Sequence, residues 1–280
     1  MSAALRIRVL LHRHPYHSWT LRVVALWQGL SAAVRVRYAD GLPPEYLGSV
    51  YGGGVFRHTT LAIDSVFAGS VLAYPVIYTG GVNPYFWRPV VGIGAFIVPT
   101  YFVDVTPFVG LLVDGRNHSL RVGVDGVIPG GLWWVNAALH LWLDPNVEAT
   151  WGGLLETEDA TFEVEERVRW YPNGVDANLS THAFHASKIR GYVVSSYGNA
   201  TCTVERTYAL HNFNQVLEEM ALDKTAQTIN TYATSVFGVE GEAVIYSSRE
   251  AFEFPLEMDI RYTLLPGTTA YNNLEGTFLL

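Results

Sequence analysis

The stretch from Phe252 to Leu264 constrains the fold more than any other part of the chain. Apolar residues occupy every second position, and mostly charged or polar residues fill the positions between them. An α-helix cannot place residues spaced by two on one face, whereas a β-strand does so at every step. The stretch therefore predicts a long strand or one arm of a hairpin.

Shorter segments elsewhere have the same alternation and are separated by Gly and Pro turns. The predicted strands are Thr59–Ile63, Val71–Tyr78, Tyr101–Val105, Leu120–Val124 and Leu139–Leu143. A further strand, 162–170, carries a face of paired charges, which predicts a solvated surface rather than a catalytic cluster. Only Gln215–Lys224 has helical spacing, through Val216, Leu217 and Met220. The fold class is thus all-β, with two layers of packed sheet.

Composition narrows the classes of function. Hydrophobic residues make up 49% of the 280 residues and charged residues only 16%, which is typical of a globular protein. The formal net charge of −8 argues against a nucleic-acid backbone as the main ligand. No run of apolar residues is long enough to predict a transmembrane helix. Three sequons, at Asn117, Asn178 and Asn199, permit glycosylation if the chain is secreted.

The first forty residues differ from the rest. They contain six of the sixteen arginines and no acidic residue before Asp40. Basic and polar residues interrupt the apolar run that a secretory signal needs, so we find no clear signal peptide. We predict that residues 1–40 are a non-native-looking or disordered segment, followed by one β-domain at 41–150 and a β-rich region at 151–280.

The sequence carries few residues or motifs that could support metal binding, thiol chemistry or nucleophilic catalysis. Cys202 is the single cysteine, and we expect an inert strand residue. His182 and His185 lie three positions apart without a supporting carboxylate, so we predict loop histidines rather than a zinc site. The chain has no Walker-type loop and no Gly-x-Ser-x-Gly motif. We predict no metal site and no cofactor.

The loop from Asn83 to Arg88 is the remaining candidate. Pro84 and Pro89 fix their own φ and restrict the residues before them, so the backbone around Trp87 and Arg88 is rigid. An indole held this way can stack on a sugar ring, and a guanidinium can donate to amide or hydroxyl oxygens. Alternatively, Trp87 fills the core and Arg88 pairs with an acid.

The same loop carries a resemblance. The stretch Val76–Pro84 continuing through Trp87-Arg88-Pro89, together with Gly92–Phe96 and Asp104–Phe108, resembles the peptide N-glycosidase A family of plants and fungi. Three other segments also resemble this family: Phe56–Asp64 before the loop, and Asn136–Asp144 and Gly191–Gly198 after it.

This resemblance implies a secreted, cofactor-free amidase built on two adjoining jelly rolls followed by a β-rich region. Such an enzyme hydrolyses the amide bond between N-acetylglucosamine and Asn of N-glycans and leaves Asp in the peptide. One carboxylate activates water, and a second polar group assists departure of the glycosylamine. The resemblance makes Trp87, Arg88 and Arg57 the expected substrate-binding residues, and it predicts an antiparallel jelly-roll sandwich for 41–150.

The departures from the family concern its acids. The jelly roll that precedes this motif is absent from the chain, and an acidic-aromatic stretch expected before Leu42–Tyr46 is replaced by Val34–Tyr38, which has no carboxylate. His58 stands where the family shows Glu after Phe-Arg. Glu45, Asp64 and Asp104 remain, but Asp104 is better placed to cap a turn than to act as a base. The catalytic residues therefore stay unknown at this point.

Two hypotheses follow from the sequence. The chain is either part of a deglycosylating amidase or a non-catalytic glycan-binding β-sandwich module. Its partner is an N-linked glycopeptide or glycan in both cases. A jelly roll without its neighbouring domain would expose an apolar face, so we also expect self-association, which light scattering would detect.

Overall fold

The computed structural model describes residues 2–7, 22–27, 56, 58–72, 100–125, 135–141, 144–159, 163–218, 221–239, 244–264 and 271–279. Nearly all of the described elements are antiparallel strands, and they are accompanied by one 3₁₀ turn, η2 (Thr106–Phe108), and one short helix, α1 (Val109–Leu112). The predicted all-β class is confirmed.

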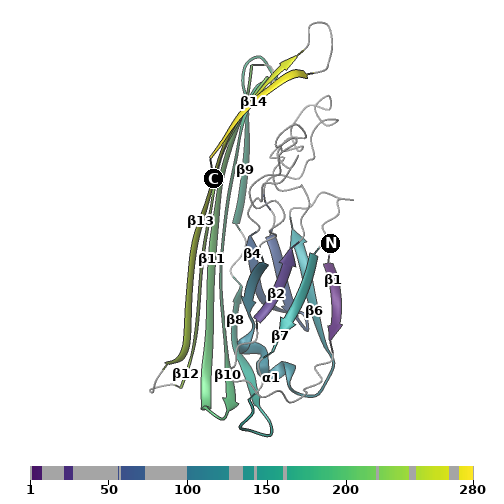
Figure 1. Cartoon of the computed structure of the whole chain (residues 1–280), viewed down its shortest axis with the longest axis vertical. Coiled ribbons are helices and arrows are strands. Elements are labelled where there is room, and N and C mark those ends of the chain that lie inside the picture. The colour runs from purple at the N-terminus through teal and green to yellow at the C-terminus, as the bar shows by residue number, and fades with distance from the viewer. Residues whose placement is uncertain are drawn as a thin grey trace.

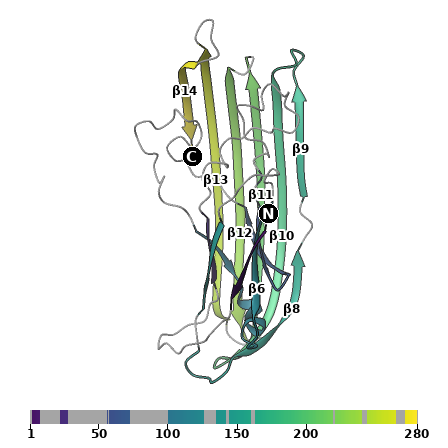
Figure 2. The same ribbon diagram turned by 90° about the vertical axis from the view of Figure 1, so that its right-hand side faces the viewer.

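A long seven-stranded sheet runs along the molecule (Figures 1 and 2). Its order is β14-β13-β12-β11-β10-β8, and β9 also pairs with β10. The strands are β8 (Trp151–Asp159), β9 (Glu163–Trp170), β10 (Ala177–Ser195), β11 (Gly198–Leu217), β12 (Leu222–Gly238), β13 (Val244–Leu264) and β14 (Tyr271–Leu279). Strand β13 contains the alternating stretch Phe252–Leu264, so that prediction is confirmed. Leu256 and Met258 are buried there, while the intervening Glu257 is exposed.

The helix predicted at Gln215–Lys224 is wrong. Strand β11 continues to Leu217 and β12 starts at Leu222, with Leu217 opposite Leu222 in the ladder. Glu218 has a φ of 54°, and its carbonyl accepts a hydrogen bond from the amide of Ala221 at 3.0 Å. A tight reversal between two strand ends therefore produced the three-to-four-residue spacing of apolar side chains that a helix also produces.

Two smaller sheets lie beside the lower half of the long sheet in Figure 1. One has the order β1-β6-β3-β4 and the other the order β5-β2-β7. Their strands are β1 (Ser2–Ile7), β2 (Arg22–Trp27), β3 (His58–Ile63), β4 (Val66–Leu72), β5 (Thr100–Asp104), β6 (His118–Asp125) and β7 (Val135–His140). The strands predicted around Leu61, Val103 and Val122 are confirmed. Beyond Leu72, the predicted Val71–Tyr78 strand lies outside the described residues.

Two strands come from the first forty residues. Strand β1 pairs with β6, and β2 lies between β5 and β7. The division of the chain at residues 40 and 150 stays a prediction, and so does the jelly-roll topology, because the segments that join β2 to β3 and β4 to β5 lie outside the described residues.

One hydrophobic core joins the small sheets to the long sheet. Phe108, on η2, is fully buried among residues from both sides of position 150, which include Ile63, Val105, Ile189 and Val193. Cys202 lies in the same cluster on β11, where burial raises the pKa of its thiol. The predicted strand position of Cys202 is confirmed, and its burial is consistent with an unreactive thiol.

Candidate functional site

The three predicted substrate-binding residues, Arg57, Trp87 and Arg88, lie outside the described residues. His58 follows Arg57 directly and is the first residue of β3. The described side chains around His58 therefore make up the candidate functional site.

His58 is paired with a carboxylate from the neighbouring strand. Its Nδ1 lies 3.1 Å from Oδ2 of Asp125, the last residue of β6 and its direct partner in the ladder. Burial lowers the pKa of His58 to about 4, although Asp125 opposes this shift. His58 is thus neutral at neutral pH, and its Nδ1–H donates to the carboxylate, which leaves Nε2 as the basic nitrogen.

A second imidazole–carboxylate pair comes from the long sheet. His185 on β10 is 1% exposed, and its Nε2 lies 2.8 Å from Oδ1 of Asp159, the last residue of β8. Its Nδ1 lies 3.4 Å from the hydroxyl oxygen of Ser70 on β4, which is also 3.4 Å from the hydroxyl of Tyr208. The rings of His185 and Tyr208 stack with centroids 5.0 Å apart. Burial raises the pKa of Tyr208 above its usual range, so this hydroxyl stays protonated.

The two pairs form one cluster at the junction of the four-stranded sheet and the long sheet. The ring centroids of His58 and His185 are 5.4 Å apart. Both imidazoles are buried, whereas the side chains of Asp125 and Asp159 are 66% and 47% exposed. Each of these solvent-accessible carboxylates is held by a buried imidazole and can exchange a proton with water. We call these four residues the His–Asp cluster.

Of this cluster, the sequence alone distinguishes only His58, because this histidine stands where the resemblance predicts Glu. Asp125 and Asp159 each end an ordinary strand, and nothing local distinguishes them from solvated strand ends. For His185 the sequence predicts a loop position. Both carboxylates were missed because 34 positions separate them in the chain and only the pairing of their strands brings them to one region.

Two of the surviving acids have structural roles. Asp104 accepts hydrogen bonds from the amide and the hydroxyl of Thr106, at 2.9 and 2.6 Å, so the predicted turn cap is confirmed. Asp64, in the turn after β3, accepts from the amide of Ser119 at 2.7 Å and lies 2.6 Å from Nδ1 of His118. The other ring nitrogen of His118 lies 2.9 Å from Asp114. Glu45 lies outside the described residues.

His118 predicts a specific pH dependence of stability. Burial alone lowers the pKa of His118, but hydrogen bonds to Asp64 and Asp114 outweigh burial and raise it. The pKa of Asp64 is lowered, chiefly by the amide of Ser119, and that of Asp114 chiefly by the amide of Arg116. The stabilisation is therefore complete between about pH 4 and pH 6.5. It is lost as pH rises through the raised pKa of His118 and as pH falls through the lowered pKa values of the aspartates.

The measurement compares thermal midpoints of the wild type and His118→Gln across this pH range. We expect their difference to be largest near pH 5.5 and to shrink above neutrality. His140→Gln, which changes an exposed histidine on β7, should leave the pH profile unchanged. A constant difference between wild type and His118→Gln at every pH would contradict the assignment.

His182 and His185 are not loop histidines as predicted, because both lie within β10. Residues three apart in a strand point to opposite faces. His182 is accordingly exposed and His185 buried, so the two cannot share one ligand. Among the described residues, no group of three or more His, Cys, Asp or Glu side chains is arranged to hold a metal ion.

Part of the chain is similar to a known protein family. Residues 37–160 match the model of a protein family described as peptide N-acetyl-beta-D-glucosaminyl asparaginase amidase A. Over these residues the chain is similar to that family. The matched range of the amidase A family contains His58, Asp125 and Asp159, while His185 and Tyr208 lie beyond it.

A curated relative extends the match. The chain is 36% identical over 167 residues to peptide-N4-(N-acetyl-beta-glucosaminyl)asparagine amidase A of Prunus dulcis. The aligned region is 58% of this chain and 28% of that amidase A, so the chain spans little more than a quarter of its relative. No solved structure matches the chain. No helix in the described ranges has both the length and the apolar character that a bilayer crossing requires.

Proposed function

We propose that this chain takes part in glycoprotein deglycosylation, by hydrolysing the amide bond between N-acetylglucosamine and Asn of N-glycans. The amidase A segment at 37–160 supports the reaction class. The observation that carries the proposal is the His–Asp cluster, because it supplies two accessible carboxylates, both inside that segment. Trp87, Arg88 and Arg57 remain the proposed contacts to the sugar, and Arg57 adjoins His58 in the chain.

The chemistry needs a base and an acid. Asp125 is accessible to solvent and lies beside a neutral His58, which suits its carboxylate to take a proton from water. The water oxygen then forms a bond to the amide carbon of the Asn side chain. As the carbon–nitrogen bond breaks, the proton that Asp125 took from water passes through Asp159 to the departing nitrogen. The products are Asp in the peptide and a glycosylamine, so atoms and charge balance without a cofactor.

The test is a glycan-release assay with the purified full chain and a fluorescent glycopeptide. We expect free glycan and a peptide in which Asn has become Asp, which mass spectrometry detects as a gain of about one mass unit. A folded, monodisperse chain that releases no glycan would refute the hydrolytic proposal and leave the second candidate function.

The similarity to the amidase A family also supports a jelly-roll sandwich at 41–150, a β-rich region at 151–280 and passage through the secretory pathway. These three features are part of the same proposal. Circular dichroism of limited-proteolysis fragments tests the domain division.

Passage through the secretory pathway is tested by mass spectrometry of the secreted product, which would detect a glycan attached to Asn199. This residue is exposed at the start of β11.

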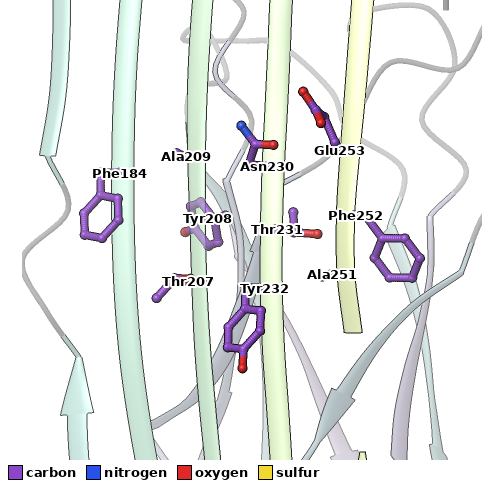
Figure 3. Close-up of a pocket in the computed structure, with 10 residues that line it drawn as sticks. All are labelled: Phe184, Thr207, Tyr208, Ala209, Asn230, Thr231, Tyr232, Ala251, Phe252 and Glu253. Atoms are coloured by element: carbon purple, nitrogen blue, oxygen red, sulfur yellow. The ribbon is translucent and has the colours of Figure 1, made fainter. Parts of the chain in front are cut away.

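The second candidate function is glycan binding without hydrolysis. A shallow hollow of about 410 Å³ lies on the outer face of the long sheet (Figure 3). The ring of Phe184, 48% exposed, stands at one side of it, and Asn230 and Glu253 supply polar groups. Tyr232 also lines the hollow, with the guanidinium of Arg249 5.3 Å from its ring centroid. An exposed ring beside hydrogen-bonding groups suits a sugar, which has apolar and hydroxyl faces.

Phe184→Ala tests this second candidate. We expect glycan affinity to fall about fivefold, because one stacking contact contributes on the order of 1 kcal/mol. The matched control is Phe213→Ala, an exposed Phe on β11 that does not line this hollow. Equal affinity for all three proteins would exclude the hollow as the binding surface.

A further inference from the structure

The outer face of the long sheet carries a pair of histidines that the proposed hydrolysis does not use. His182 on β10 and His211 on β11 are direct partners in the antiparallel ladder, and both are exposed. They share this face with Phe184, which lies two residues further along β10. They therefore lie on the side of the sheet opposite to the buried His185.

The two imidazoles face each other through equivalent atoms. Their Nδ1 atoms are 2.8 Å apart, and the rings meet edge to face with centroids 5.1 Å apart. At this distance one Nδ1 must donate and the other accept, so at least one of the two nitrogens presents a lone pair. Two nitrogens that hold one proton between them can hold a metal ion in its place, since neutral imidazole is the commonest metal ligand in proteins.

We propose that His182 and His211 form a two-imidazole site for a divalent transition-metal ion such as Zn²⁺. With bonds of about 2.0–2.1 Å, tetrahedral coordination places two nitrogens about 3.3 Å apart. Opening the pair by about half an ångström is a small rotation for exposed side chains on a rigid ladder. Strand pairing holds both Cβ atoms in place, so the entropic cost of bringing the ligands together is already met by folding.

The surroundings supply further oxygen atoms. A hollow of about 310 Å³ adjoins the pair and includes Ser180, Thr228 and Glu257 among its lining residues. On the other side, Glu165 of β9 is directly opposite His182 in the ladder, although its carboxylate is hydrogen-bonded to Arg167. Solvent or an external donor would complete the coordination sphere, as in zinc sites that keep open positions.

The experiment is a calorimetric titration of the full chain with ZnCl₂. We expect one zinc site per chain. Its affinity should fall about 100-fold or more in His182→Ala and in His211→Ala, because loss of a ligand should cost more than the roughly 10–100-fold typical for loss of a group that only supports a ligand. The triple variant His12→Ala/His14→Ala/His17→Ala removes three histidines near the start of the sequence, and His140→Ala removes an exposed histidine on β7. Both control variants should keep the site.

A second readout separates metal binding from misfolding. Because the ion links β10 to β11 only in the folded state, ZnCl₂ should raise the thermal midpoint of the wild type. The two alanine variants should have the wild-type midpoint without zinc and show no increase with it. Zinc affinity and thermal shift that are unchanged in both variants would overturn the proposal. The result is independent of glycan release, so failure of one proposal leaves the other intact.

Discussion

Replacing Asp125 with Asn should reduce glycan release by about 10²–10⁴-fold, the usual contribution of a general base. The Asn side chain has the same shape, and its amide oxygen can still accept the hydrogen bond from Nδ1 of His58. The fold should therefore survive, because the Asp125 side chain is 66% exposed and its removal leaves no buried cavity. What disappears is the negative charge that takes a proton from water.

Two further variants make this test specific. Asp159→Asn should lower release as well, because it removes the group that assists the departing nitrogen. Asp259→Asn changes a half-exposed aspartate that pairs with Lys224 on the long sheet, at 3.0 Å, and should leave release unchanged. Measured rates that are the same for wild type, Asp125→Asn and Asp159→Asn would remove the His–Asp cluster from the reaction.

Gly191→Ala should be among the most destabilising single changes in the chain. A Cβ added at Gly191, on β10, would lie 2.2 Å from the carbonyl oxygen of Pro107 and 2.7 Å from its Cα. These are backbone atoms of η2, which seats Phe108 in the core, so no side-chain rotation relieves the clash. We expect a loss of about 3 kcal/mol in the free energy of unfolding.

Urea unfolding followed by circular dichroism measures this loss. Gly123→Ala is a matched control in another strand, because its added Cβ would meet only the hydroxyl of Thr60, at 2.8 Å, which can rotate away. We expect that control to change stability by less than about 1 kcal/mol. A Gly191→Ala protein as stable as the wild type would show that η2 does not pack against β10 at this position.

Local patterns predicted local structure well. The alternation in Phe252–Leu264 identified β13, and Asp104 before Thr106 identified a turn cap, because both depend on residues close together in the chain. The helix at Gln215–Lys224 failed for a related reason. Over so few residues, the hairpin between β11 and β12 spaces apolar residues as a helix does. Only the pairing of Leu217 with Leu222 distinguishes the hairpin from a helix.

The amino-acid sequence by itself determined the all-β class, the similarity to the amidase A family and the strand position of Cys202. The tertiary structure decided which polar side chains meet: His58 with Asp125, His185 with Asp159, and His182 with His211. The physical reason is strand register. A shift of one residue turns every side chain of a strand to the other face, and register is set by pairing between segments far apart in the chain.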